Sequence, residues 1–142
     1  MSFDFKLTGG SFVLGEAGDI EITQHNEKLA QDIIKIIATS VGQSKLHPWY
    51  GTVINERIIG SGVSSGLLKA QVEESIQFAL QNLKSIQEQA ERAGQLLSPR
   101  EAISAIENVT VLDTTDPRQL LIRISVRTRS GSKLQQDLPL NI

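Results

Sequence analysis

The chain has 142 residues, which fits one domain with one hydrophobic core. Its apolar and charged shares of 39% and 21% argue against wholesale disorder, and its net charge of −2 argues against a strongly basic nucleic-acid binder. The absence of cysteine excludes disulfides and thiolate metal sites and suits a reducing cytosol. No apolar run approaches the roughly 20 residues that span a bilayer, and the N-terminus carries no signal-peptide pattern, so we expect folding in a cytoplasm without export by the usual route.

The N-terminal part of the chain predicts short strands followed by a helix. Apolar and polar residues alternate over residues 3–8, and residues 11–14 and 19–23 predict a second hairpin around a glycine-containing turn at 15–18. Asn26 is a suitable N-cap for the helix, which is expected to stop near Val41 and Gly42. Its apolar face is expected to hold Leu29, Ile33, Ile36 and Ile37.

The middle of the chain predicts one long helix. Residues 43–66 have the composition of a loop, in which residues 52–59 combine strand and short-helix character. Apolar residues then recur at three- and four-residue steps, which predicts a helix over residues 65–93 that ends at Gly94. At 1.5 Å per residue it would be on the order of 40 Å long. The outer face of this helix is expected to be rich in glutamine, with Gln71, Gln77, Gln81, Gln87 and Gln89.

The C-terminal third predicts most of the sheet. Ser98 and Glu101 with Pro99 between them form the pattern of a capping box, after which a short helix through Ile103 and Ile106 could follow. Helix and strand both remain open for residues 101–107. The elements expected after it are a strand at 109–112, a polar turn at 113–118, a strand at 119–129, a tight turn at 130–132 and an irregular strand at 133–140. The whole chain, residues 1–142, is therefore predicted to form a single α+β domain, with a small mixed or antiparallel sheet packed on a long central helix and a C-terminal β-hairpin.

The strand at 120–129 has the most informative pattern in the chain. Its even positions are apolar or β-branched, and its odd positions carry Arg123, Arg127 and Arg129, with Leu121 as an exception. Because side chains alternate between the faces of a strand, an apolar inner face and an arginine-lined outer face are expected. If this strand has a free edge, another chain can add to it through main-chain hydrogen bonds. Charges on an edge strand can also serve only to prevent aggregation, and both interpretations remain open.

The sequence carries no recognisable catalytic or metal-binding pattern. His25 and His47 are the only histidines, and without cysteine they do not supply the three or four donors of a metal site. The glycine-rich residues 60–66 lack the lysine and the spacing of a phosphate-binding loop. Sixteen acidic residues ensure that some pair lies close enough for glycoside hydrolysis, but no segment has a glycosidase signature. We expect no enzymatic activity, no metal and no cofactor.

Taken in order, these segments resemble the baseplate wedge proteins of contractile-tailed phages, a family that includes components of type VI secretion systems and contractile injection particles. The resemblance rests on a helix that leads into Thr-Ser-Val-Gly at 39–42 and Pro-Trp-Tyr-Gly at 48–51, then the long helix, a Pro-Arg step at 99–100 and a terminal hairpin. It covers roughly residues 3–140. The family's glutamate-proline-arginine step is serine-proline-arginine here, with a glutamate only at Glu101, and the loop at 52–66 is longer.

The resemblance implies a structural virion protein that docks on the wedge core of the baseplate and initiates the tail sheath by C-terminal strand pairing, with the strands at 120–129 and 133–140 carrying the sheath contacts. It implies the sheath, wedge, and tube or hub proteins as partners, without nucleic acid or membrane, in the virion tail and in the host cytoplasm during assembly. Some family members carry a lysozyme-type label, so a peptidoglycan hydrolase of the baseplate is the alternative; Trp49 and Tyr50 could also be core residues. The residues expected to bind partners are Arg123, Arg127, Arg129 and Lys133 for the sheath, and Arg100, His47, Trp49 and Tyr50 for the wedge core.

Overall fold

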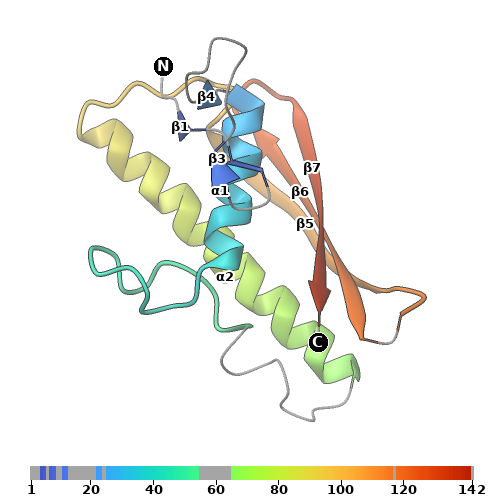
Figure 1. The fold of residues 1–142 in the computed structure, drawn as a ribbon. Helices are drawn as coiled ribbons and strands as arrows, with labels where there is room; N and C mark the ends of the chain where they lie inside the picture. Colours follow the sequence, from blue (N-terminus) through green and yellow to red (C-terminus); the bar gives the residue numbers. More distant parts are fainter. Residues whose placement is uncertain are drawn as a thin grey trace.

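Two helices and a three-stranded sheet form the body of the computed structural model (Figure 1). The structure describes residues 4–5, 7–8, 11–12, 22–23, 25–54, 65–116 and 118–141. The α+β class is confirmed. The elements are β1 (Asp4–Phe5), β2 (Leu7–Thr8), β3 (Ser11–Phe12), β4 (Ile22–Thr23), α1 (His25–Ala38), α2 (Ser65–Arg92), β5 (Ile103–Asp113), β6 (Gln119–Thr128) and β7 (Lys133–Asn141).

The main sheet is antiparallel, with the strand order β5-β6-β7. The arginine-bearing strand β6 lies in the middle, where Arg123 stands opposite Thr110 of β5 and Asp137 of β7. The sequence left open which strand has a free edge, and the structure shows that β6 has a neighbouring strand on each side. The alternation of apolar and polar residues shows which face of a strand is buried. Central and edge strands have the same alternation when only one face of the sheet is covered, so the pattern does not show where a strand lies in the sheet.

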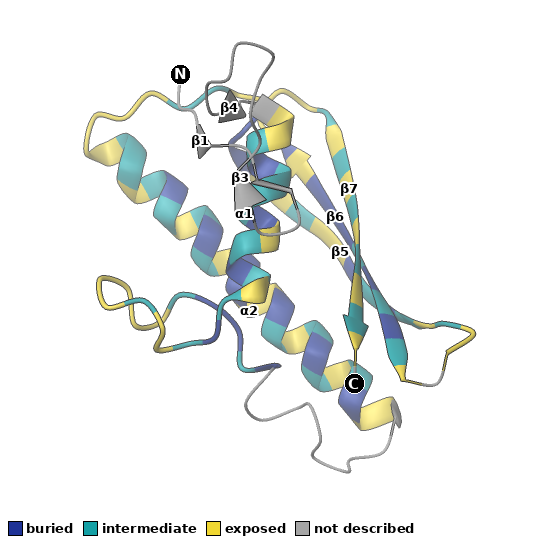
Figure 2. Cartoon of the chain, in the orientation of Figure 1, coloured by how far each residue is buried: buried dark blue, intermediate teal, exposed yellow. Residues whose placement is uncertain are grey.

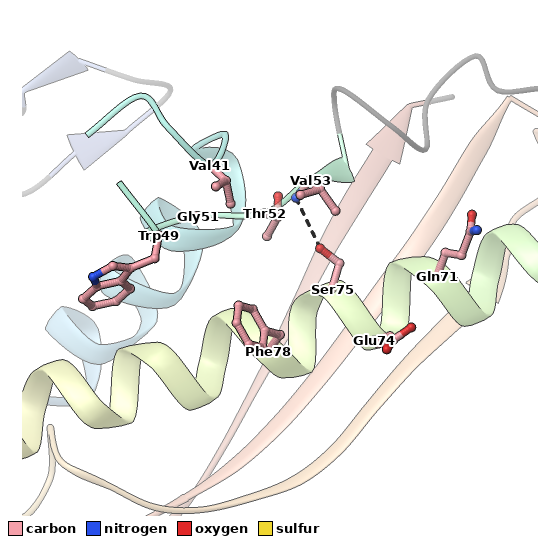
Figure 3. Close-up of a pocket in the computed structure, with 9 residues that line it drawn as sticks. All are labelled: Val41, Trp49, Gly51, Thr52, Val53, Gln71, Glu74, Ser75 and Phe78. Carbon is pink, nitrogen blue, oxygen red and sulfur yellow. Dashed lines mark hydrogen bonds between the residues drawn. The ribbon is translucent and has the colours of Figure 1, made fainter. Parts of the chain in front are cut away.

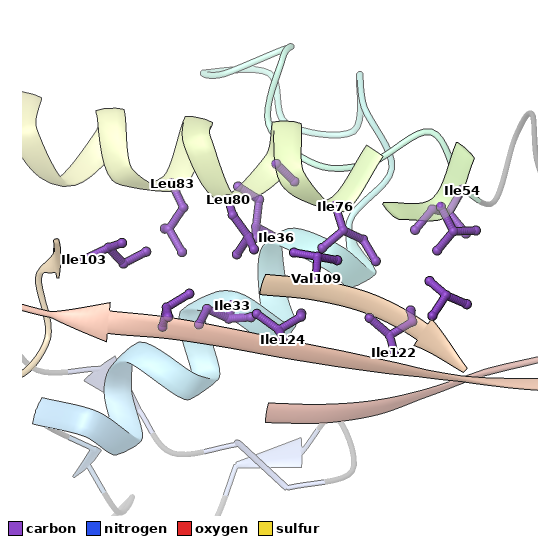
Figure 4. Packing of buried hydrophobic residues seen from close by; sticks show 14 of the residues in the cluster. Ile33, Ile36, Ile54, Ile76, Leu80, Leu83, Ile103, Val109, Ile122 and Ile124 are labelled. Atoms are coloured by element: carbon purple, nitrogen blue, oxygen red, sulfur yellow. The ribbon is translucent and has the colours of Figure 1, made fainter. Parts of the chain in front are cut away.

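Both helices cover one face of the sheet, α2 against β5 and α1 against β7. The predicted apolar stripe of α2 meets the even positions of β6 in one core, in which Ile76, Leu80 and Ile124 are fully buried (Figures 2 and 4). Ile33 and Ile36 bring the predicted face of α1 into the same core. The sequence periodicity of 3.6 on the helices and of 2 on β6 is thus explained by one shared interior.

Helix α2 ends where its sequence indicates. Gly94 has a φ of 96°, and its N–H donates to the Glu91 carbonyl at 3.0 Å. The N–H of Gln95 donates to the Ala90 carbonyl, also at 3.0 Å. These two bonds form a Schellman motif, which satisfies carbonyls that the end of the helix leaves open.

Helix α1 departs from the prediction at both ends. It begins at His25, one residue before the expected N-cap Asn26, and it ends at Ala38 rather than near Gly42. After Ala38 the chain turns to Ser40, which forms a parallel bridge with Thr52. The partner for this bridge lies in the following loop, so the local sequence did not indicate where the helix would stop.

The sequence left helix and strand open for residues 101–107, and the structure places Ile106 in β5, where it pairs with Val126. The residues of the capping box make the expected kind of bonds around a single turn. Ser98 N–H donates to the Glu101 carboxylate at 3.0 Å, and Arg100 N–H donates to Ser98 Oγ at 3.3 Å. The chain then enters the sheet at Ile103.

The N-terminal strands pair differently from the expected hairpin of residues 11–14 with 19–23. Strand β3 pairs with β2, and β4 pairs with β1, both antiparallel. The predicted turn at 15–18, most of the segment at 52–59 and most of the glycine-rich stretch at 60–66 lie outside the described residues; Ser65 and Gly66 belong to α2.

Candidate docking surfaces

The arginines of β6 do form a row on the outer face of the sheet, but acids from other elements neutralise them. Arg123 donates from Nε and Nη2 to Asp137 at 3.1 and 3.2 Å, and Arg127 Nε donates to Glu107 Oε1 at 2.8 Å. The remaining ion pairs here are Arg129 with Glu91, and Lys133 with Glu107. The arginine-lined outer face expected from the strand is therefore present, but its charge is neutralised by acids of β7, β5 and α2 that the strand's own sequence does not contain.

The pair of Arg123 and Asp137 stabilises the charged form of both groups. The hydrogen bond and the charge of Asp137 raise the pKa of Arg123 above its ordinary value. The hydrogen bond to Arg123 lowers the pKa of Asp137, against a smaller opposing effect of desolvation. Asp137 is thus held ionised on the exposed face of β7, in direct register with Arg123.

Strand β7 is an edge strand, and its hydrogen-bonding direction can be worked out from two bonds. Val111 N–H points away from β6, because it donates to Glu73 of α2 at 3.0 Å, and Thr128 N–H donates to the Ser132 carbonyl at 2.9 Å. Because Val111 stands opposite Ile122, the N–H and C=O groups of Ile122 must point toward β7. Thr128, six residues later on β6, also points its N–H toward β7, so both bonds assign the even residues of β6 to the ladder with β7. The even residues of β7 therefore bond to β6, and the odd residues point their N–H and C=O groups outward. Pro139, which has no N–H, occupies one of the outward positions.

The other edge of the sheet receives hydrogen bonds from side chains of α2 at two positions. On β5, Glu73 accepts from Val111, and the side-chain amide of Gln87 accepts from Ile103 N–H at 2.8 Å. The same amide donates to the Glu101 carbonyl at 2.7 Å. Gln87 was expected on the polar outer face of α2 and is instead buried. Within the described ranges, no backbone group bonds to the outer edge of β7, so β7 is the edge that lacks a backbone partner among these residues.

The segment after α1 closes into a loop that presents His47, Trp49 and Tyr50. Thr52 N–H donates to the Thr39 carbonyl at 2.8 Å, and Val41 N–H donates to the Thr52 carbonyl at 3.0 Å. The His47 ring lies against Trp49, with 5.3 Å between the ring centroids. Trp49 is 37% exposed, so it is not a core residue, whereas Tyr50 is partly buried against the core.

Trp49 and Phe78 border a groove of about 440 Å³ between this loop and α2 (Figure 3). Phe78 is 62% exposed, and the loop is tied to the helix by a 3.4 Å bond from Val53 N–H to Ser75 Oγ. Glu74 is the carboxylate that lines the groove. Sequence reasoning missed Phe78, although a phenylalanine on the glutamine-rich face of the helix was a visible signal.

Arg100 lies on a different part of the molecule from the Trp49 loop. It is exposed in the turn between α2 and β5, whereas Trp49 lies beside the middle of α2. The structure therefore does not bring the two predicted wedge-core elements into one site. Partner binding by any of these residues remains a prediction.

The described ranges contain no cluster of three or more histidine or acidic side chains suited to a metal ion. Neither of the two helices there has the length and apolar character needed to cross a bilayer.

Among solved structures, the chain shares its fold with a crystal structure from Geobacter sulfurreducens that is provisionally named a tail lysozyme. The TM-score is 0.58 and the sequence identity is 23%, and the match covers 93% of this chain and 96% of that one. No protein-family model matches the chain, and no curated protein matches it. The comparison relates the chain to a tail protein through its fold.

This neighbour also contradicts one expectation from the sequence. We expected a protein without enzymatic activity, whereas the name of the matching structure is that of an enzyme. The sequence argument relied on the absence of a linear signature. Carboxylates that act together are brought together by the fold, so the lack of a signature did not justify that expectation.

Proposed function

We propose that this chain is a baseplate protein of a contractile tail, and that it starts the tail sheath by accepting a strand from the sheath protein along β7. The observation that carries the proposal is the asymmetry of the sheet: side chains of α2 bond to the β5 backbone at Ile103 and Val111, while the outward groups of β7 bond to no described backbone group. An open edge is a template for strand addition. The shared fold with a tail protein supports the setting.

The second surface in this proposal binds the wedge proteins. Exposed Phe78 and Trp49 form an apolar groove of the kind that buries an anchoring side chain of a partner. Arg100 offers an exposed guanidinium at the turn before β5. The Trp49–Phe78 groove and Arg100 lie apart, so they would contact different parts of a wedge assembly. The proposed location of the protein is the tail.

Replacing Gln135 with proline should abolish binding of the sheath protein from the same genome. The backbone N–H of Gln135 points away from β6, so proline removes an N–H from the outer edge of β7 and places its ring there. The hydrogen bonds between β7 and β6 stay intact. The Gln135→Ala variant keeps the N–H and is expected to bind like the wild type. Affinity can be measured by biolayer interferometry on immobilised full-length chain, with circular dichroism to verify folding. Wild-type affinity of the proline variant would refute strand addition at β7.

The second candidate function is peptidoglycan hydrolysis, which the name of the Geobacter neighbour favours. Glu74 is the carboxylate in the Trp49–Phe78 groove, so this candidate assigns it the acid–base role. It predicts turbidity loss in a suspension of purified peptidoglycan, reduced at least a hundredfold by Glu74→Gln and unaffected by Glu27→Gln on the exposed side of α1. Clearing that persists in the Glu74 variant would remove Glu74 from this role, and no clearing by the wild type would reject the candidate.

A further inference from the structure

A second groove lies directly beside the free edge of β7. It has a volume of about 230 Å³ and runs between α1 and the end of β7. Ile34 on its helix side is 39% exposed. Its lining is entirely apolar: Ile34, Ile37, Ala38, Ile54, Ile122, Leu138, Pro139 and Leu140.

The geometry of strand addition connects this groove to the edge. Side chains of an added strand alternate between the two faces of the sheet, as they do on β7. On the inner face, Leu138 and Leu140 of β7 are only partly buried, and they pack against the core beneath α1. An added strand would lie beyond them, so its inward side chains would meet the exposed flank of α1 at Ile34.

The outer face of β7 is polar, with Lys133, Gln135 and Asp137 at alternate positions. Lys133 has an exposed side chain, and Asp137 is held as an anion by Arg123. Side chains of an added strand on this face therefore meet a cation at one end and a carboxylate farther along. Pro139 removes one N–H beside the groove, so side-chain burial must hold the partner there.

We propose that the α1–β7 groove selects the segment that adds to β7: an extended segment whose inward residues are branched aliphatics seated against Ile34, Leu138 and Leu140, and whose alternate residues are polar. This inference rests on the proposed strand addition and names the chemistry of the partner segment. The apolar lining provides the match for its inward side chains, and the continuity of the groove with the open edge commits the occupant to an extended strand.

The test compares Ile34→Gln with Leu67→Gln, an equivalent change at a leucine of α2 that is 53% exposed and lines neither groove. The probe is the same full-length sheath protein, and Gln135→Pro is measured in parallel. We expect about tenfold weaker binding for Ile34→Gln, unchanged binding for Leu67→Gln, and thermal unfolding close to wild type for both.

The outcomes separate this inference from the proposed function. If Gln135→Pro abolishes binding and Ile34→Gln does not weaken it, strand addition stands and the groove plays no part. If Gln135→Pro binds like the wild type, strand addition at β7 fails, and the groove inference fails with it. Equal loss of affinity for the sheath protein in Ile34→Gln and Leu67→Gln would also refute the groove inference, because the effect would then not depend on the position of the substitution.

Discussion

Replacing Gln87 with alanine is expected to destabilise the fold by about 3 to 5 kcal/mol, from two buried backbone groups left without partners and a small cavity. The Gln87 amide is the partner of both Ile103 N–H and the Glu101 carbonyl, at 2.8 and 2.7 Å. Glu101 and Ile103 are each almost fully buried, so water cannot easily replace the lost bonds. Chemical denaturation followed by circular dichroism measures the change in the free energy of unfolding.

Two further variants isolate the cause of this effect. Gln89→Ala changes an exposed glutamine of the same helix and should alter stability by less than about 0.5 kcal/mol. Gln87→Glu keeps an oxygen for Ile103 N–H but places a buried carboxylate against the Glu101 carbonyl, so at neutral pH it should destabilise the fold at least as much as Gln87→Ala. A Gln87→Ala protein within about 1 kcal/mol of wild type would mean that the two bonds do not hold β5 against α2.

The second large effect is expected at Gly51, where alanine should cost about 3 to 5 kcal/mol. Gly51 has a φ of 119°, which residues with a side chain rarely adopt. A Cβ there would overlap the Thr39 carbonyl oxygen and lie 2.9 Å from its carbon. Both atoms are backbone and belong to the bridge between residues 39–41 and Thr52, so they cannot move aside without breaking it.

Gly42 provides the matched control, because it lies in the same loop with a φ of 93°, and a Cβ added to it would meet no neighbouring atom within 4 Å. Gly42→Ala should therefore show backbone strain alone, about 1 to 2 kcal/mol. Thermal unfolding of both variants, with tryptophan fluorescence of Trp49 as a local probe, measures the difference. Equal destabilisation by the two substitutions would show that the contact with Thr39 is unimportant.

Much of the fold could be predicted because it depends on repeating patterns. The helix at 65–93 and the inner face of the strand at 120–128 each repeat an apolar period over many residues, and both are confirmed. The N-terminal half of β5 has no such repeat: two register shifts interrupt it, and polar residues fill most of residues 104–108. A capping box before it then favoured helix, although its bonds close only one turn.

The candidate surfaces were harder to predict, because they depend on residues that are distant in sequence. Trp49 was singled out, but its neighbour in the groove, Phe78, lies 29 positions later. The acids that neutralise Arg127 and Arg129 come from β5 and α2. The strand order also could not be obtained from alternation, so the sequence left open which strand has a free edge, and the structure places β5 and β7 at the two edges.

The central position of β6 gives β7 a protective role against aggregation. β6 carries four buried aliphatic residues at alternate positions, and its arginines are neutralised within the fold. If β7 separated from the sheet, β6 would become an edge strand of high β-propensity, which is the kind of segment that stacks with copies of itself. β7 itself carries Lys133, Asp137 and Pro139, residues that discourage such stacking. The outermost strand therefore covers the aliphatic strand β6 and places charged residues and a proline at the edge of the sheet.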